Sequence, residues 1–477
     1  MFIGRKEELS FMNSILHLLR PGSPQLIVLH GRRRVGKSEL LLQWAAHSGI
    51  PFAYWLVARE SVAMQRNRLW SRLVDVPLEK NSTPPSWPSL WEAAAKTLAD
   101  KRFILIVDEL PYALDIDPEI LPALKSAWDE HFQNAQVVVV LCGSQVRSMR
   151  HVLSPQSPLS DRITARFQLW PLPFSGLHGF FPKWSAEERL AIYAIAGGVP
   201  AYLSWLDADR NLVSNIREII LSTGSMFLAE PDLLFSDEFH EPAHYIAILK
   251  AIGAGCHTLS QISQYCLLAR TNVNAYLANL QELNIVERRL PATLSPDQRD
   301  RSHNGRYFIS DPYLRFYFGF LSPYLDEAPF DQEQLMDTLT QNLPTFIGQT
   351  AFLELSRQWV SVQGKSGELP FTPEMVGGHW NGRVRVDVAA TNWKTQELLL
   401  ADCQWGTDPL DEQAIRDLIE VKTPLTLKNF PDRGKGWKVY YAWFARRGFS
   451  SAAQVEIQKH SGLAVDLKMM DQSLGRE

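Results

Sequence analysis

The sequence predicts an α/β fold that begins with a parallel sheet covered by helices on both faces. Short apolar runs occur at residues 26–30, 51–57, 103–107 and 136–141, and helix-forming stretches separate them. Strands that are apolar along their whole length are buried on both faces. Their alternation with helices is typical of a parallel sheet.

Size and composition indicate a multidomain globular protein. At roughly 100–200 residues per domain, the 477 residues suggest about three domains. The hydrophobic fraction of 45% is ordinary for a globular chain. No apolar run approaches the roughly 18 residues of a membrane span, so no membrane contact is expected.

The N-terminal residues and the cysteines favour a cytoplasmic protein. The first residues lack the apolar region of a signal peptide. The four cysteines are scattered without a C-x-x-C pair, which does not indicate a disulfide framework or a zinc site. The net charge of -4 gives no general argument for nucleic acid, so any such surface would be a local patch.

A glycine-rich loop follows the first predicted strand and precedes a predicted helix. It matches G-x-x-x-x-G-K-[ST] at every fixed position with Gly31, Arg32, Arg33, Arg34, Val35, Gly36, Lys37 and Ser38. Backbone N–H groups of such a loop wrap a phosphate, and the helix N-terminus favours the same anion. We expect Lys37 to reach the β- and γ-phosphates of ATP and Ser38 to ligate Mg²⁺. The predicted ATP-binding segment extends to Glu39.

Acidic and polar residues end the next two strands in the expected places. Asp108 and Glu109 follow the strand at 103–107. Asp108 is predicted to hold Mg²⁺, and Glu109 to orient or deprotonate the attacking water. Ser144 follows the strand at 136–141 and is a candidate for contact with the γ-phosphate or the water; a plain turn serine is the alternative. Arg162 is a candidate cation for the transition state, from the same or a neighbouring subunit.

Four stretches resemble the archaeal-type ATPase family, on the AAA+/STAND side of the P-loop NTPases. They are residues 2–9 (FIGRKEEL), 31–38 (GRRRVGKS), 196–203 (AGGVPAYL) and 309–316 (ISDPYLRF). The resemblance implies that Arg5 lies in a box beside the base and that Pro200, in a helical lid, lies near the adenine. The chain departs from the family at 159–162, where it reads LSDR instead of YGRR.

Residues 245–309 predict a winged helix-turn-helix. Three amphipathic helical stretches precede two short strand-like pieces at 285–290 and 305–309. The third helix of a DNA reader enters the major groove, and here it would present Arg270, Asn272 and Asn274. Arg288 and Arg306 on the wing would hold phosphate. Packing within the chain, or against a protein partner, is the equally weighted alternative.

The last part of the chain is similar to the restriction-endonuclease-like fold. Asp387 lies on one predicted strand and Asp402-x-Gln404 on the next, with Glu354 on a preceding helix. Nucleases of this kind use an acid and then D/E-x-K to bind a metal ion. Gln404 stands at the lysine position, which favours a degenerate binding module over an active nuclease or an unrelated α/β domain.

The predicted organisation is an ATPase core (1–172), a helical lid (173–238), a winged helix (239–322), a linker (323–341) and the nuclease-like domain (342–477). Three functions fit this organisation. The first is an Mg²⁺-dependent ATPase whose nucleotide state controls the later modules, with DNA as a candidate partner. The second is a slowly hydrolysing switch that acts through protein partners or a homo-oligomer. The third is an ATP-controlled nuclease.

Overall fold

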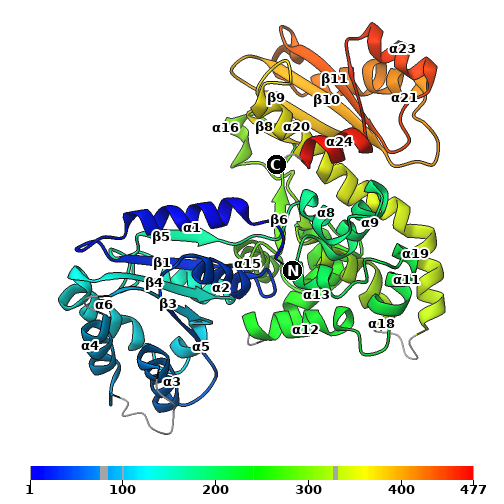
Figure 1. Ribbon diagram of the computed structural model, residues 1–477. Helices are drawn as coiled ribbons and strands as arrows, with labels where there is room; N and C mark the ends of the chain where they lie inside the picture. Colours follow the sequence, from blue (N-terminus) through cyan, green and yellow to red (C-terminus); the bar gives the residue numbers. More distant parts are fainter. Residues whose placement is uncertain (1, 76–83, 99–100, 240, 326–330, 476–477) are drawn as a thin grey trace. The chain divides into compact units, whose positions relative to one another are not determined.

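The chain folds into two compact units. The structure, a computed structural model, describes residues 2–75, 84–98, 101–239, 241–325 and 331–475 (Figure 1). One unit comprises Met1–Pro171, Val199–Ala201 and Asp232–His240. The other comprises Leu172–Gly198, Tyr202–Pro231 and Glu241–Glu477.

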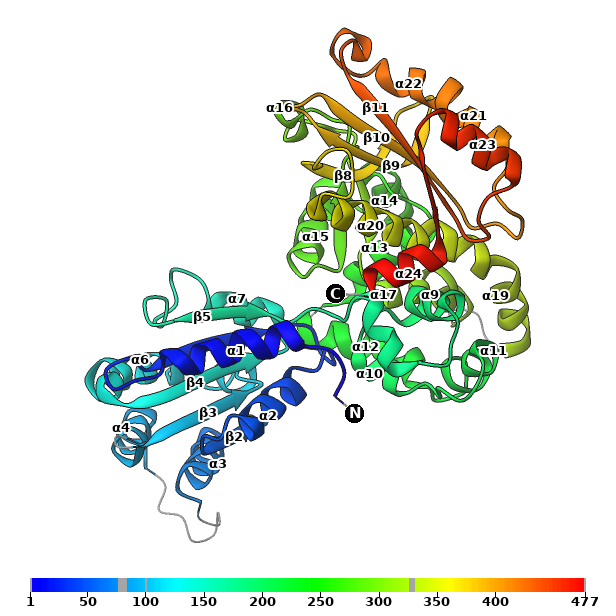
Figure 2. The ribbon, with the colours of Figure 1, turned by 45° about the horizontal axis from the view of Figure 1, so that its top comes forward.

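The first unit is built on a parallel five-stranded sheet in the order β2-β3-β4-β1-β5, which confirms the predicted fold class. β1 lies between β4 and β5, so the loop after β1 emerges beside the ends of these two strands. Figure 2 shows the paired strands β3 and β4 of this sheet side by side. Four of the strands were predicted, whereas the short β5 was not. The strands are β1 Gln25–His30, β2 Phe52–Leu56, β3 Arg102–Asp108, β4 Gln136–Gly143 and β5 Ala165–Gln168.

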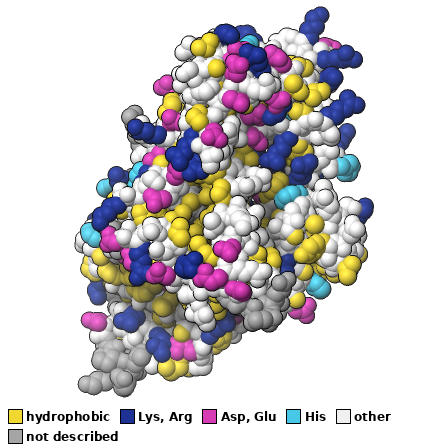
Figure 3. Space-filling view, turned by 90° about the vertical axis from the view of Figure 1, so that its right-hand side faces the viewer, with side chains coloured by type: hydrophobic (Ala, Val, Ile, Leu, Met, Phe, Trp, Pro, Cys, Tyr) yellow, Lys and Arg dark blue, Asp and Glu magenta, His cyan; other side chains and the backbone are white. Residues whose placement is uncertain are grey.

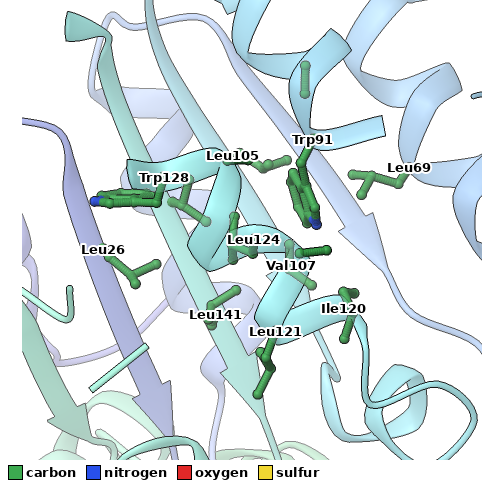
Figure 4. Packing of buried hydrophobic residues seen from close by; sticks show 14 of the residues in the cluster. Leu26, Leu69, Trp91, Leu105, Val107, Ile120, Leu121, Leu124, Trp128 and Leu141 are labelled. Carbon is green, nitrogen blue, oxygen red and sulfur yellow. The ribbon is translucent and has the colours of Figure 1, made fainter. Parts of the chain in front are cut away.

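Alternate residues of the central strands face two separate cores. Leu105 and Val107 of β3 pack with tryptophans such as Trp91 (Figure 4). Ile104 and Ile106, which alternate with them along the strand, face the opposite core. Burial on both faces explains why these strands are continuously apolar. The helices are α1 Lys6–Leu18, α2 Lys37–His47, α3 Val62–Val74, α4 Trp87–Leu98, α5 Pro111–Leu114, α6 Ile120–Glu130 and α7 Val146–Val152.

Helices form where the sequence predicted a lid, and they belong to the second unit except for the start of α10 and the second half of α12. Ser185 and Glu188 form a capping box that starts α9. Gly197, with φ 64°, ends α9, and a Cβ there would meet the Pro312 ring at 3.4 Å. The helices are α8 Leu177–Phe180, α9 Ala186–Ala196, α10 Pro200–Ser204, α11 Leu212–Asn215 and α12 Met226–Glu238.

Three helices and a two-stranded antiparallel sheet occupy the region of the predicted winged helix. Thr258 and Gln261 form the capping box that begins its second helix. Val273, Leu277 and Leu280 are the buried face of its third helix. The elements are α13 Ala243–Gly253, α14 Leu259–Cys266, α15 Arg270–Glu282, β6 Val286–Arg289, α16 Pro296–Arg299 and β7 Arg306–Ile309.

The predicted linker at 323–341 is largely helical in the structure. Asp331 caps α19, whose buried face includes Leu335 and Leu339. An acidic stretch with a proline suggested a linker, but burial of these apolar residues stabilises a helix there. Residues 326–330 of the predicted linker lie outside the described residues. The helices here are α17 Pro312–Phe316, α18 Ser322–Leu325 and α19 Gln332–Ile347.

A second five-stranded sheet forms the C-terminal part in the order β12-β11-β10-β9-β8. β8, β9 and β10 pair antiparallel, whereas β10, β11 and β12 pair parallel. Leu399 and Leu400 of β10 belong to separate cores on the two faces. The elements are α20 Leu353–Ser366, β8 Met375–Trp380, β9 Arg385–Asn392, β10 Glu397–Gln404, α21 Glu412–Arg416, the π-helical turn η7 Asp417–Lys422, α22 Thr423–Leu427, β11 Lys438–Ala445, α23 Ser451–Lys459, β12 Leu463–Asp466 and α24 Leu467–Leu474.

The surface of the second unit carries an apolar groove of about 320 Å³ lined by residues of α9, α11 and α19. Figure 3 views the molecule from the side on which Figure 1 draws α11 and α19, and hydrophobic side chains lie at the surface there. Among the described residues, no helix combines the length and apolarity that a membrane crossing requires.

Candidate nucleotide site

The loop between β1 and α2 has the backbone that a phosphate cradle requires. Gly36, with φ 94°, and Arg34, with φ 67°, are left-handed. A Cβ at Gly31 would stand 2.4 Å from the Leu169 carbonyl oxygen, so only glycine fits at that position. Turns of this kind expose consecutive N–H groups to an anion at the helix N-terminus.

A buried lysine gives this loop its positive charge. Lys37 is 5% exposed, and its Nζ donates to the Arg32 carbonyl oxygen at 3.2 Å. The structure describes no ion pair for Lys37, so its charge is kept for a ligand. The pKa of the neighbouring His30 is lowered to about 4, first by burial and then by the positive charges of Arg150 and Lys37. The ring is therefore neutral near pH 7.

Asp108, at the end of β3, is fully buried and receives two hydroxyl hydrogen bonds. Ser38 Oγ and Tyr54 Oη donate to its Oδ2 at 2.5 and 2.6 Å. The structure thus joins the two predicted metal ligands, Ser38 and Asp108. Tyr54 lies on β2 and was not predicted; burial and the hydrogen bond to Asp108 raise its pKa, so it stays a donor.

Glu109 is held by the residue that follows β4. The Ser144 backbone N–H and hydroxyl donate to Glu109 Oε2 at 3.0 and 2.7 Å. Glu109 has a left-handed backbone with φ 56°. Because parallel strands β3 and β4 end side by side, two residues 35 positions apart meet at one edge of the sheet.

Three further contacts surround the loop. Arg5 Nη2 donates to the Val35 carbonyl oxygen at 3.0 Å, so Arg5 supports the loop backbone. Pro200 Cγ lies 3.9 Å from the position of a Cβ on Gly36. Arg33 forms an ion pair of 2.7 Å with Asp237, a partner that the sequence did not indicate.

Two other predicted residues have different surroundings. Arg162 Nε donates to Asp129 Oδ1 at 2.5 Å, so its described partner is on α6. Glu39 is exposed in the first turn of α2. Buried Lys37, the paired Ser38 and Asp108, and the left-handed Gly36 fit ATP with a divalent cation.

The C-terminal acidic residues are held by cations. Lys422 Nζ lies 2.6 Å from Asp402 Oδ2, while the pKa of Asp402 is raised to about 6 by burial, against the effect of Lys422. Asp387 Oδ2 accepts from the Cys403 backbone N–H at 3.1 Å. Gln404 ends β10, two residues after Asp402. Lys422 comes from η7, so no motif spacing predicted it.

Glu354 is separate from the Asp387 and Asp402 carboxylates in its described contacts. Arg289 and Arg315 donate to Glu354 at 2.7 and 2.8 Å and lower its pKa against the effect of burial. Among the described residues, no group of three or more His, Cys, Asp or Glu side chains is arranged to hold a metal ion.

The two predicted DNA-contacting surfaces differ in their contacts with the rest of the chain. On α15, Arg270, Asn272 and Asn274 are exposed. The wing instead packs on the C-terminal sheet, because the Ala292 backbone N–H donates to the Gly378 carbonyl oxygen at 2.8 Å. The Arg306 guanidinium lies over the Trp380 ring, 5.3 Å from the ring centroid. Arg288 donates to the Ser302 carbonyl oxygen at 2.6 Å.

Comparison with known proteins agrees with the fold and the loop. A family model described as an ATPase domain predominantly from Archaea matches residues 2–206. A second, described as archaeal and bacterial proteins of unknown function, matches residues 317–418. An uncharacterised protein of Methanocaldococcus jannaschii is 31% identical over 409 residues, 85% of this chain and 88% of that protein. The fold and loop define a P-loop ATPase, and the chain belongs to the archaeal-type ATPase family.

Two solved structures are similar to this chain at lower sequence identity. A Walker-type ATPase of Pyrococcus abyssi is 21% identical, with a TM-score of 0.48, covering 66% of this chain and 96% of that one. The ORC2 protein of Aeropyrum pernix, solved as ADPNP–ADP complexes, is 14% identical, with a TM-score of 0.45, covering 72% and 93%.

Proposed function

We propose that this protein hydrolyses ATP with Mg²⁺ at the loop Gly31–Ser38. The pairing of Ser38 with Asp108, beside the Glu109–Ser144 pair, carries this proposal. Lys37 binds the β- and γ-phosphates, and Ser38 and Asp108 hold the cation. The cation, when bound, neutralises charge that develops on the phosphates. Glu109 orients the attacking water once its carboxylate leaves Ser144.

The connectivity of the chain supports control of the second unit by the nucleotide. Val199–Ala201 and Asp232–His240 belong to the first unit, whereas their neighbours in the chain belong to the second. Pro200 lies beside Gly36, and Asp237 pairs with Arg33. A nucleotide that displaces either contact therefore moves segments that are continuous in the chain with the second unit.

The exposed face of α15 is our proposed DNA-contacting element. The alternative is a slow switch that acts on a protein partner, or a homo-oligomer that uses Arg162.

The test is steady-state ATP turnover with and without duplex DNA. We expect Mg²⁺-dependent turnover, and about 10²-fold or greater loss in Glu109→Gln with ATP binding retained. Glu119→Gln, which changes an exposed glutamate of the same unit, is the control. Wild-type protein without turnover under any condition contradicts the ATPase and leaves the switch.

DNA binding is tested separately by fluorescence anisotropy. Arg270→Ala with Asn272→Ala is expected to weaken binding by at least about tenfold, since base contacts contribute about 1–3 kcal/mol each. Lys468→Ala, which changes an exposed lysine of α24, is the control. Equal binding by both variants would exclude α15 as the contact surface.

A nuclease is the second candidate, because Lys422 brings an ammonium group to Asp402 although Gln404 lacks one. Asp387, Asp402 and Lys422 would then share the catalytic work. Mn²⁺- or Mg²⁺-dependent DNA cleavage, lost in both Asp387→Ala and Lys422→Met, supports this candidate. Cleavage unaffected by either change would come from another site or a contaminant.

A further inference from the structure

An arginine-lined cavity lies between the β6–β7 hairpin and the C-terminal sheet. Its volume is about 300 Å³, and its lining includes Arg288, Arg289, Arg299 and Arg357 together with Glu287 and Glu354. We call it the arginine cavity. Its size is at the lower end of the range for small-molecule sites, roughly 300–1,000 Å³.

The two glutamates of the arginine cavity are already neutralised. Arg289 pairs with both Glu287 and Glu354, and Arg315 also pairs with Glu354. Their negative charges are therefore balanced by two arginines. In the part of the chain that the structure describes, these glutamates form no ion pair with the other arginines that line the cavity.

Carbonyl oxygens hold the remaining three guanidinium groups. Arg357 Nη2 donates to Asp387 O at 2.8 Å, Arg299 Nη1 to Pro291 O at 3.2 Å and Arg288 Nη2 to Ser302 O at 2.6 Å. A carbonyl fixes the direction of a guanidinium without cancelling its charge. Among the described residues, these three arginines form no ion pair with a carboxylate. Burial lowers the pKa of Arg299, and burial followed by the positive charge of Arg289 lowers the pKa of Arg357.

Glycines leave room for two of these side chains. A Cβ on Gly378 would stand 2.7 Å from Arg357 Nη2, and one on Gly305 would stand 2.3 Å from Arg288 Nε. Trp380 supplies an aromatic wall, with Arg306 stacked 5.3 Å from its centroid. Aromatic rings beside guanidinium groups suit a nucleobase next to a phosphate.

We propose that the arginine cavity binds the phosphate monoester of a nucleotide. A phosphate monoester carries about 1.5–2 negative charges near neutral pH, and planar guanidinium groups pair with its oxygens. The source is a free nucleoside monophosphate or the 5′-phosphorylated end of a nucleic-acid strand. Bound there, the ligand contacts the hairpin and the sheet together and stabilises their docking. This site is distinct from Gly31–Ser38.

The test is calorimetric titration of the full chain with its ATP site saturated by a non-hydrolysable ATP analogue and Mg²⁺. The probes are AMP, adenosine, inorganic phosphate, and a tetranucleotide with or without a 5′-phosphate. We expect AMP or the phosphorylated tetranucleotide to bind one-to-one, and adenosine and the unphosphorylated strand not to bind. Preference for AMP identifies a free nucleotide, and preference for the strand identifies a nucleic-acid end.

Variants decide whether the binding occurs in the arginine cavity. Arg299→Gln and Arg357→Gln are each expected to weaken binding about tenfold or more, since hydrogen bonds to charged groups contribute about 1.5–3 kcal/mol. Arg416→Gln, on α21 among carboxylates, is the matched control. If Arg357→Gln does not fold, Arg288→Gln on the exposed side of the hairpin replaces it. Unchanged affinity in the variants, or no binding of any phosphorylated probe, overturns the proposal.

Discussion

Carboxylates at the nucleotide site have neutral hydrogen-bond donors as partners, whereas carboxylates of the C-terminal part have cations. Asp108 and Glu109 accept hydrogen bonds from hydroxyl and N–H groups of Ser38, Tyr54 and Ser144. Asp402 and Glu354 are paired with an ammonium group and guanidinium groups. Neutral donors orient a carboxylate and leave its charge for a metal ion, whereas a cation cancels that charge.

The cations of the molecule also differ in the kind of partner that they contact. Lys37 and Arg357 both donate to carbonyl oxygens, so both keep a positive charge for an anion. Lys422, by contrast, is committed to Asp402 and Asp417. The type of partner thus separates groups available to a ligand from groups committed to the fold. Four predictions test this distinction, from the largest expected effect to the smallest.

The strongest test removes the available cation of the nucleotide site. Lys37→Ala is expected to lower ATP turnover by about 10²–10³-fold, the cost of losing one directed charge at a transition state. Turnover and binding of a fluorescent ATP analogue are the measurements. Lys96→Ala, on the exposed face of α4, should behave like the wild type. Near-normal turnover in Lys37→Ala would contradict the claim that the charge of Lys37 acts on the nucleotide.

Lys422→Met tests the committed cation of the C-terminal sheet. Asp402 would be left partly buried with a carboxylate that has no cation, at an expected cost of about 2–3 kcal/mol. Because the pKa of Asp402 is already about 6, the cost should shrink below that pH as Asp402 takes up a proton. Thermal unfolding measures it, with exposed Lys428→Met as control. Asp402→Asn added to Lys422→Met should recover stability; no recovery would show that Lys422 acts by packing alone.

The Glu238 carboxylate accepts a hydrogen bond from a neutral donor and is largely shielded from solvent. The Val146 backbone N–H donates to it at 3.0 Å, while burial raises its pKa from 4.5 to about 7. Between these pH values the unfolded chain loses the proton and the folded chain keeps it, so stability falls as pH rises. Glu238→Gln should remove this slope and be more stable than the wild type by about 1–2 kcal/mol at pH 8. Parallel unfolding curves for both proteins between pH 5 and 8 would contradict the shift.

The smallest expected effect concerns the hydroxyl of Tyr54. Tyr54→Phe removes one neutral donor from Asp108, and we expect about a threefold change in the Mg²⁺ concentration for half-maximal turnover. The Mg²⁺ dependence of ATP turnover is the measurement, and Tyr265→Phe, exposed on α14, is the control. An effect as large as that of Lys37→Ala would place Tyr54 in direct contact with the nucleotide.

The sequence alone determined four of the five strands of the first sheet, the phosphate loop and the acids at the strand ends. These features are local, because a strand, a loop and a helix follow one another and the spacing of Gly31, Gly36 and Lys37 sets the backbone. The places of Asp108 and Glu109 also follow from one strand. The proximity of Ser144 to them was expected, since neighbouring parallel strands end at one edge.

Only the tertiary structure decided which polar and charged side chains pair with one another. Tyr54 reaches Asp108, Asp237 reaches Arg33, and Lys422 reaches Asp402 across separations that no motif encodes. The docking of the β6–β7 hairpin on the C-terminal sheet likewise places Arg288 at a cavity and Arg306 over the Trp380 ring, and the chain order indicated neither contact. Packing brings distant segments together, and electrostatic pairing depends on distance in space; sequence spacing fixes that distance only within a turn, a helix or adjacent strands.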